Sequence, residues 1–508
     1  HDRALLSMLL RMLRNWSSPD LLVYDANPFG GATGFSYKPL TDSSVYTKDT
    51  GAQAAVYPVV DVQSALYVVS NIYVTEGYIY SYTYGGAKEH LLGRGFLGFR
   101  YMQETDSSAD KKTTTFYNQT YPHTGLPSNI ETDRASDGAP FRASIHNYKN
   151  QNAYLSTAPT VSFVGPETID IVEQEGSTTP SRTIRREFFY DDPSTGNLIR
   201  TLHHGDISFT GDERDEKTEW IVDTTNWLHR PKHHQVFNGD TTQPGASLLR
   251  EKWLYYDGMP YGQMTAGLLT KEELNGGDPQ GGGNNNPVTG KNPVTTFVPD
   301  PTFGITTSVR DARGCETTTV FESTKTFPAT ITNCLGHAMS LTFDARFGFK
   351  TSETDPNGAL TSYDPDGFGR LTRVIGPLDS PTNPTTIVEY LDWGTPSLQR
   401  VKTSRRELHG GAGVLWSEDY FDGLGRVDQV KKEGPDNTII MSESAFDSRG
   451  LVLAATAPHF STEAAVTTNF TYDVLGKQTR VDHPDGTHAD TAYAPGLITI
   501  TDERGEVR

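Results

Sequence analysis

The sequence is short of hydrophobic residues, of basic residues and of long apolar runs. Hydrophobic residues make up 35% of its 508 residues, which is a low share for a helical enzyme. Lysine and arginine number 44 against 63 aspartates and glutamates, so the net charge of −19 argues against a nucleic-acid-binding surface and favours a merely solvated acidic one. No run of about 18 apolar residues occurs, so no segment meets the length of a membrane-spanning helix.

Aromatic and turn-forming residues are plentiful instead. The chain has 24 Tyr, 23 Phe, 48 Gly and 30 Pro, a balance typical of many short strands with alternating faces, separated by turns. Its length allows two to four ordinary domains or one elongated repeat array. The segment Ala4–Leu13 is apolar and helix-like, too short to span a membrane and without a cleavage-type end. We interpret both ends, His1 and Arg508, as cuts through a longer polypeptide.

An aromatic–aspartate turn unit recurs along the second half. Three copies begin at residues 421, 446 and 472, so the steps are 25 and 26 residues, and a fixed period in this range indicates a repeat architecture. Phe343-Asp344 begins a looser copy. The residues that we assign to the turn units are Tyr363, Asp364, Gly369, Arg370, Phe421, Asp422, Gly425, Arg426, Phe446, Asp447, Gly450, Tyr472, Asp473 and Gly476.

Each residue type of the unit has a mechanical reason. The aromatic residue ends a strand and supplies apolar surface. The Asp accepts hydrogen bonds from backbone amides two residues on, and the Gly provides the positive φ of a tight turn. The Arg or Lys opens the return strand, and a second turn follows, as in Asp482–Gly486 or Asp355–Gly358. The unit is therefore strand, turn, strand, turn, and the chain is predicted to be an all-β antiparallel hairpin array.

These units resemble the YD repeats of the Rhs family, which includes the B and C components of bacterial insecticidal toxin complexes. Segments of the first half, among them Tyr37–Tyr46, Tyr57–Asp61, Gly93–Arg100 and Tyr121–Pro127, are similar to the middle region of the B components. The resemblance covers roughly residues 25 to 508. It implies a spiral sheet that forms a hollow shell, or part of one, around a C-terminal toxin.

The organisation along the chain follows from composition. Residues 1–20 are expected to be a helix and linker at the edge of a fragment, and residues 21–265 a strand-rich region with degenerate repeats. Residues 266–294 are Gly/Asn-rich and predict a surface loop, with a domain boundary as the alternative. Residues 295–508 hold the clearest repeats and are interpreted as a truncated repeat-shell region.

The two cysteines, Cys315 and Cys334, flank a candidate hairpin. Pairing residues whose numbers sum to 649 places Cys315 opposite Cys334 and Thr318 opposite Ile331. A cross-strand disulfide is then geometrically allowed. The alternative is two separate thiols.

Three patterns suggest ligand chemistry, and each has a simpler interpretation. Gly93–Gly98 matches the dinucleotide fingerprint G-x-G-x-x-G, but a strand rather than a helix is expected after it, so bending glycines are favoured. The histidines His203, His204, His229, His233 and His234 lack neighbouring cysteines or an H-E-x-x-H helix, which favours structural roles over metal binding. The Asp-rich turns at 364–367 and 482–485 lack the spacing of a Ca²⁺ loop.

No catalytic set stands out, so the chain is predicted not to be an enzyme and to need no cofactor or metal. Asp355–Gly358 is similar to part of the Rhs self-cleaving segment, but repeats continue after it, so a turn is favoured. The resemblance implies a secreted bacterial shell that encapsulates and helps deliver a C-terminal toxin. The implied partners are that toxin or a C-component shell half, and a pore-forming or secretion-system partner, without nucleic acid or a direct membrane span. The alternatives are a cell-surface adhesion or recognition module and a carbohydrate-active β-enzyme.

Overall fold

The computed structural model describes residues 21–152, 162–179, 181–191, 195–275 and 292–508. In these ranges the chain is almost entirely antiparallel β-sheet, which confirms the predicted fold class. The helices there are 3-10 turns of three residues: η1 (Gly51–Gln53), η2 (Thr75–Gly77) and η4 (Pro435–Asn437). The helix expected in residues 1–20 lies outside the described residues. Within the described ranges no helix is long and apolar enough to cross a membrane.

One sheet holds 35 strands, and it starts with strands that are separated by longer excursions. The order at this end is β1–β2–β5–β6–β9, and every pair in it is antiparallel. The sheet then continues with each strand beside its predecessor. The strands of this first part are β1 (Tyr24–Ala26), β2 (Ala32–Pro39), β5 (Tyr67–Val74), β6 (Tyr78–Gly85), β9 (Tyr101–Asp106), β10 (Lys111–Tyr117), β11 (Pro127–Arg134), β12 (Pro140–Asn152), β13 (Ser162–Glu173) and β14 (Arg182–Tyr190).

The middle of the sheet is an uninterrupted series of hairpins. This series continues across residues 266–294, which composition assigned to a loop, because β19 (Leu269–Leu274) pairs with β20 (Val294–Pro299). That loop is therefore shorter than expected, and its residues 276–291 lie outside the described ranges. The strands here are β15 (Leu198–Asp206), β16 (Arg214–Asp223), β17 (Leu228–Asn238), β18 (Ser247–Tyr256), β19 (Leu269–Leu274), β20 (Val294–Pro299), β21 (Thr306–Arg310), β22 (Glu316–Phe321), β23 (Pro328–Thr332), β24 (Ala338–Asp344), β25 (Phe349–Thr354) and β26 (Leu360–Pro365).

The last part continues the same pattern to the end of the chain. The short strand β34 lies beside the first half of β32, while β33 pairs with its second half and with β35. The strands are β27 (Leu371–Ile375), β28 (Thr386–Leu391), β29 (Arg400–Arg406), β30 (Val414–Phe421), β31 (Val427–Glu433), β32 (Ile439–Phe446), β33 (Val452–Thr456), β34 (His459–Phe460), β35 (Thr467–Tyr472), β36 (Gln478–Asp482), β37 (His488–Ala494) and β38 (Leu497–Thr501).

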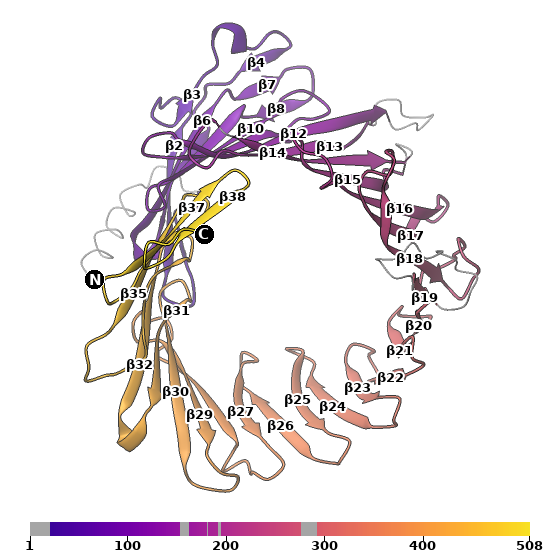
Figure 1. Cartoon of the computed structure of the whole chain (residues 1–508), viewed down its shortest axis with the longest axis vertical. Coiled ribbons are helices and arrows are strands. Elements are labelled where there is room, and N and C mark those ends of the chain that lie inside the picture. Colours follow the sequence, from indigo (N-terminus) through magenta and orange to yellow (C-terminus); the bar gives the residue numbers. More distant parts are fainter. Residues whose placement is uncertain (1–20, 153–161, 180, 192–194, 276–291) are drawn as a thin grey trace.

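A small lobe projects from the start of the sheet, outside the ring that the strands form in Figure 1. It contains β3 (Tyr46–Thr47) and a three-stranded sheet of β4 (Val59–Asp61), β7 (Lys88–His90) and β8 (Gly95–Gly98). Its apolar core joins the lobe to β6, because Tyr84 of that strand packs with buried residues of the excursions. Those residues are Leu40, Val45, Tyr46 and Ala87.

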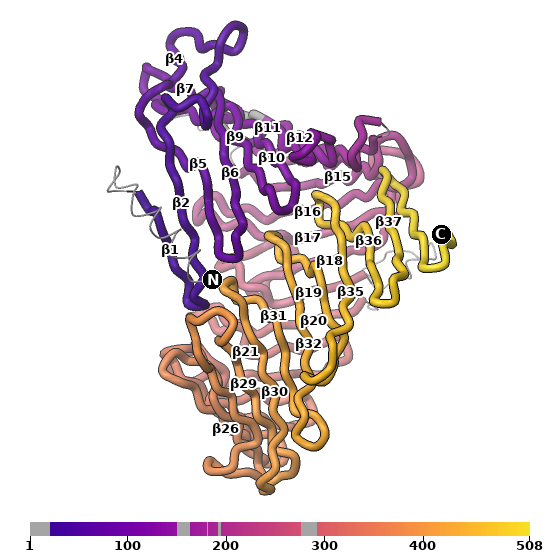
Figure 2. The backbone as a smooth tube through the Cα atoms, turned by 90° about the vertical axis from the view of Figure 1, so that its left-hand side faces the viewer, coloured from indigo at the N-terminus to yellow at the C-terminus, as the bar shows by residue number. Residues whose placement is uncertain are grey.

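The sheet curls round until its last strands lie against its first strands (Figures 1 and 2). Because consecutive strands are antiparallel, the turns alternate between two edges of this ribbon, and we name the edges after their position in Figure 2. The upper rim of the late part carries the turns at residues 366–370, 392–399, 422–426, 447–451 and 473–477. The lower rim of the early part carries the turns at residues 27–31, 75–77, 107–110, 135–139 and 174–176. The sheet is thus an open spiral, in which these two rims meet.

Candidate functional site: the seam between the windings

The aromatic–aspartate turns on the upper rim share one geometry. One carboxylate oxygen of Asp473 accepts hydrogen bonds from the amides of Leu475 (2.9 Å) and Lys477 (2.8 Å), and Gly476 has a φ of 84°. Asp422 accepts in the same way from Leu424 and Arg426, both at 2.9 Å. Asp447 accepts from Arg449 at 2.8 Å and from Leu451 at 2.9 Å. In all three units the strand ends at the aromatic residue before the Asp.

The unit that begins at Tyr363 differs from the expectation. Tyr363 and Asp364 lie inside β26, where Asp364 pairs with Arg373 across the hairpin. The turn is capped by Asp366, whose carboxylate accepts from the amides of Phe368 (2.8 Å) and Arg370 (2.9 Å). The assignment of Asp364 to the turn was therefore wrong, because the hairpin is two residues longer than the aromatic–aspartate pair suggests.

A ladder of arginines joins successive turns of the upper rim. Arg426 binds the carboxylate of its own Asp422 at 2.6 Å and donates to the backbone oxygen of Asp447, in the next turn, at 2.9 Å. Arg449 repeats this with Asp447 at 2.7 Å and with the backbone oxygen of Asp473 at 2.6 Å. Each arginine thereby fixes the position of the following turn.

We name the contact between the upper rim and the lower rim of the first winding the seam. It begins with an aromatic plug. Phe29 of the β1–β2 turn lies 5.3 Å from the ring of Trp393 and 6.3 Å from that of Phe421. Gln399 is completely buried beside it and donates to the backbone oxygens of Phe29 (2.8 Å) and Asp422 (2.8 Å). The β1–β2 turn is thus inserted between two late turns.

Two tyrosines of β6 continue the seam. The Tyr78 hydroxyl donates to the backbone oxygen of Phe446 at 2.8 Å, and that of Tyr80 to Ser448 at 3.2 Å. The Ser448 hydroxyl in turn donates to the Asp106 carboxylate at 2.6 Å. Burial raises the pKa of Asp106, but hydrogen bonds from Ser108 and Ser448 outweigh it and hold the pKa below its usual value. Asp106 is therefore an ionised anchor for Ser448.

A small cavity and an ion pair mark the far part of the seam. The cavity has a volume of about 230 Å³ and is lined from both windings, by Arg134 and Phe141 on one side and by Tyr472 and Val474 on the other. Lys477 forms an ion pair with Glu175 of the first winding. Burial, together with the Glu175 carboxylate, raises the pKa of Asp473 against the effect of its hydrogen bonds.

Among the described residues, every hydrogen bond across the seam involves at least one side chain. These hydrogen bonds join residues 302 to 396 positions apart. The backbone–backbone hydrogen bonds of the described residues all stay within hairpins, neighbouring strands and the lobe. The seam therefore resembles a docked interface between two bodies more than a continuation of the sheet.

The cysteine hairpin has the disulfide that the spacing allowed, in a register shifted by one. Cys315 and Cys334 are joined, with their Cα atoms 5.0 Å apart. Thr318 lies opposite Thr332, not Ile331, because a β-bulge near the turn moves the pairing by one residue.

The other patterns of the sequence occupy structural positions. Strand β8 lies within the dinucleotide-like motif, and strand β9 rather than a helix follows it. His233 lies between the carboxylates of Glu251 (2.8 Å) and Glu219 (3.4 Å). Burial lowers the pKa of His203 and that of His234. His204 pairs with Glu187 and His229 with Asn197. In the part of the chain that the structure describes, no three His, Cys, Asp or Glu side chains are grouped as a metal site requires.

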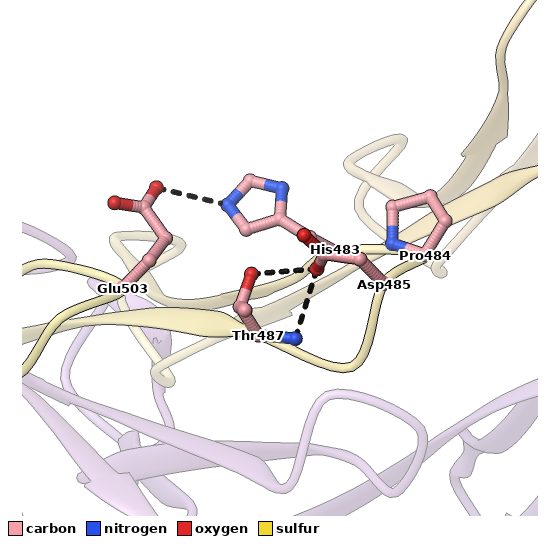
Figure 3. A pocket seen from close by; sticks show the side chains of 5 residues that line it. All are labelled: His483, Pro484, Asp485, Thr487 and Glu503. Carbon is pink, nitrogen blue, oxygen red and sulfur yellow. Dashed lines mark hydrogen bonds and ion pairs between the residues drawn. The ribbon is translucent and has the colours of Figure 1, made fainter.

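A surface depression lies on the lower rim of the last strands, away from the seam. It has a volume of about 580 Å³ and is lined by the turn at residues 483–487 and by Glu503. His483 binds Glu503 at 3.2 Å and Asp485 binds Thr487, and Figure 3 shows how these side chains lie. The first contact joins neighbouring turns, and the second lies within the turn, as turn chemistry predicts for the Asp-rich segment.

Comparisons with known proteins give two family matches. Residues 6–125 match the family model of the insecticide toxin TcdB middle/N-terminal region, and residues 351–380 match the RHS repeat model. No curated protein matches the chain in sequence. The two matched stretches carry motifs on which the sequence resemblance rests.

Solved structures share the fold at low sequence identity. The crystal structure of TcdB2-TccC3-Cdc42 is similar with a TM-score of 0.75 and 11% identity, over 96% of this chain and 36% of that one. The Photorhabdus luminescens Tc holotoxin pore with a mutated TccC3 gives a TM-score of 0.74 and 11% identity, over 95% of this chain and 35% of that one. This chain thus spans about a third of the chains that it matches. It carries the sequence signatures of the TcdB middle region and of the RHS repeat on the spiral sheet of the TcdB2-containing structures.

Proposed function

We propose that this chain is a segment of the wall of a bacterial toxin-complex shell, which encloses a C-terminal toxin polypeptide and holds it until delivery. The observation that carries the proposal is the seam, because its contacts join the first and last parts of the spiral ribbon into one wall. The family matches and the shared fold support the same role.

The physics of a winding sheet suits a container. Strand edges are hydrogen-bonding templates for other chains, and in the main sheet of the described residues nearly every strand from β2 onwards is paired on both edges. Residues alternate between the two faces of each strand, so one face lines the interior and the other meets solvent. An enclosed polypeptide therefore meets side chains rather than free backbone groups.

The partners that we propose follow from the relatives. One of the similar structures contains TccC3 together with TcdB2, and another is a holotoxin pore with a mutated TccC3. We propose that this chain assembles with a corresponding C-component shell half or C-terminal toxin, and with a pore-forming or secretion-system partner, outside the producing cell. In this role the chain acts as a wall, without catalysis and without a cofactor.

Limited proteolysis of the assembly tests the proposal. The full chain is expressed with its cognate toxin component, and digestion of the toxin segment is followed against the free toxin segment. We expect the enclosed segment to be cleaved at least about tenfold more slowly, because cleavage requires opening of the wall. Digestion at the rate of the free segment, in an assembly shown to be folded, would sink the container role and favour the adhesion module.

A seam variant is the matched control. Phe29→Asp places a charge in the aromatic plug between Trp393 and Phe421, while the strand ladders stay intact. The assembled variant is expected to keep its β-sheet circular dichroism and to lose much of the protection. Full protection in this variant would show that the seam is not what seals the wall.

A further inference from the structure

The five turns that the repeat units form on the upper rim differ in one ion pair. In four of them an arginine binds the aspartate of its own turn: Arg346 binds Asp344, Arg370 binds Asp366, Arg426 binds Asp422 and Arg449 binds Asp447. In the fifth, Lys477 lies four residues after the aspartate, where Arg426 lies in its turn, and it reaches across the seam to Glu175. The amides of Leu475 and Lys477 bind one carboxylate oxygen of Asp473, and no described side chain binds the other.

The same aspartate lines a cavity. Asp473 is part of the wall of the 230 Å³ cavity between the two windings, in which Phe141 and Tyr472 supply aromatic surface and Asp110 and Arg134 carry charges. A water molecule occupies about 30 Å³ of the liquid, so the cavity has room for a compound of about seven non-hydrogen atoms. The carboxylate that lacks an arginine therefore lies beside a space that a small organic compound can fill.

The charged groups of the first winding around this cavity already have partners. The guanidinium of Arg134 is paired with the carboxylate of Asp137 at 2.9 Å. The carboxylate of Asp110 accepts hydrogen bonds from the amide of Ser136 at 2.8 Å and from its hydroxyl at 2.6 Å. Asp473 is thus the charged residue of the wall that has an oxygen left for a ligand.

Negative charge is in excess around the cavity. Glu175 lies behind its wall, since the Glu175 amide donates to the backbone oxygen of Phe141 at 3.2 Å. Its side chain is 4% exposed, and one of its carboxylate oxygens is buried without a partner. Burial and the charge of Glu175 raise the pKa of Asp473, as expected where negative charge predominates. The carboxylates of Asp110, Asp137, Glu175 and Asp473 are balanced here by two cations, Arg134 and Lys477.

We propose that this cavity binds a small organic cation of the guanidinium class, which takes the place on Asp473 that an arginine takes in the other repeat turns. A planar guanidinium donates two parallel hydrogen bonds to a carboxylate, and it stacks on aromatic rings such as those of Phe141 and Tyr472. Because both windings contribute to the wall, the bound cation stabilises their docking. The site goes beyond the container role and does not depend on it.

Calorimetric titration of the full chain tests the chemistry of the ligand. Propylguanidinium, with seven non-hydrogen atoms, is expected to bind with a Kd of about 1 mM or tighter. Propylurea has the same shape without the charge, and we expect it to bind at least about tenfold more weakly. Equal binding of the two compounds, or no binding of propylguanidinium to the folded chain, would overturn the proposal.

Two substitutions of aspartate locate the site. Asp473→Asn is expected to weaken the binding of propylguanidinium at least about tenfold. The matched control is Asp502→Asn, because Asp502 caps a turn of the same kind outside the seam, where its carboxylate accepts from the amides of Arg504 and Glu506. An equal loss in both variants would show that the compound does not bind at Asp473.

A substitution of Lys477 fills the site from within the chain. Lys477→Arg supplies the guanidinium that the turn lacks, so we expect a higher melting temperature and at least about tenfold weaker binding of propylguanidinium. Lys477→Gln removes the ion pair with Glu175 but adds no guanidinium, and it is expected to retain the binding. Undiminished binding to the Lys477→Arg variant, or equal losses in the two variants, would refute the replacement of a missing arginine.

The guanidinium has two sources, a free compound or the side chain of an arginine in a polypeptide. Titration with the amide of N-acetylarginine distinguishes them. Binding of propylguanidinium alone assigns the site to free compounds, because the backbone of the longer molecule is then excluded. Binding of both assigns it to an arginine side chain, and binding of neither defeats the proposal.

Discussion

The aspartates of the upper rim act through one oxygen each. A single carboxylate oxygen of Asp422, Asp447 or Asp473 accepts two backbone amides, and the second oxygen of the first two is left for an arginine. Charge-assisted hydrogen bonds of this kind are stronger than neutral ones. The Asp therefore closes the turn and holds the basic side chain that reaches the next turn.

Substitution of the turn glycine tests the geometry of the turn. Gly476 has a φ of 84°, and a Cβ there would lie 3.2 Å from Leu451. We expect Gly476→Val to lower the free energy of unfolding by about 1–3 kcal/mol, because a β-branched residue is strained at this φ. Chemical denaturation measures the loss. Gly367→Val is the control, since open space surrounds that position and its φ is not in the left-handed region; equal losses in both variants would contradict the strain argument.

Glu322 offers a pH-dependent test. The hydroxyl and amide of Thr324 and the amides of Thr326 and Phe327 donate to its carboxylate and lower its pKa to about 2. A lowered pKa stabilises the fold fully above the ordinary value near 4.5, and this contribution is lost as the pH falls through 2. Carboxyl NMR titration should place the midpoint near 2. Thr324→Val should raise it, and a midpoint at the ordinary value in the native chain would refute the turn geometry.

Sequence reasoning at the residue scale succeeded where spacing was unambiguous. The caps at Asp422, Asp447 and Asp473 were assigned from the pattern alone and are present. The pattern misplaces the cap of the earlier unit because Asp364 and Asp366 both fit a turn: the aromatic neighbour favours Asp364, whereas the distance to glycine favours Asp366. In the units at 422 and 473 the Asp lies three residues before the glycine, a spacing that selects Asp366 in the earlier unit.

At the scale of elements, the arginine ladder sets the distance between hairpins. The sequence suggested only that Arg or Lys opens the return strand, since the acceptor of each arginine lies 21 or 24 residues away in the next turn. A local pattern does not indicate such a partner. The cysteine hairpin shows the same limit, because its register depends on a bulge that the sequence does not signal.

The ladder predicts a difference between two arginines. Arg426 bridges two turns, and its side chain is 19% exposed, whereas Arg346 pairs with Asp344 inside its own turn and is 76% exposed. We expect Arg426→Gln to cost about 1–3 kcal/mol of unfolding free energy, because it leaves a buried carboxylate and a carbonyl without their donor. Arg346→Gln should cost less than about 0.5 kcal/mol, as exposed pairs do. Similar costs in denaturant titrations would argue against a ladder.

At the scale of the whole molecule, the sequence predicted a spiral but not where its windings touch. Periodicity and turn chemistry determine hairpins and their succession, which are local. The seam joins Asn27 to Gly423 and Asp106 to Ser448, across 396 and 342 residues. Phe29 and Gln399 are ordinary residue types in ordinary turns, so nothing in the sequence indicates that they are buried. Their burial follows only from the curvature of the whole sheet, which is the sum of many small strand twists.

A disulfide across the seam tests this closure. Asp106→Cys with Ser448→Cys replaces a 2.6 Å side-chain contact, and we expect the pair to oxidise readily and to raise the melting temperature by several degrees. Ser136→Cys with Ser448→Cys is the control, because Ser136 binds Asp110 within the first winding. Peptide mapping identifies the bonds. Failure of the first pair to oxidise in a folded protein would show that the rims do not meet as described.

The seam also imposes a fixed register between successive windings, because each turn on one rim must face a particular turn on the other. The turn at 422–426 meets the turns at 27–31 and 75–77, and the turn at 473–477 meets Glu175. If one hairpin were added or deleted between the two windings, every later turn of the upper rim would shift by one position. All the pairs of turns that form the seam would then be mismatched at once. The seam thus fixes the number of hairpins in each winding. Insertions that lengthen the wall are confined to turns that lie outside the seam.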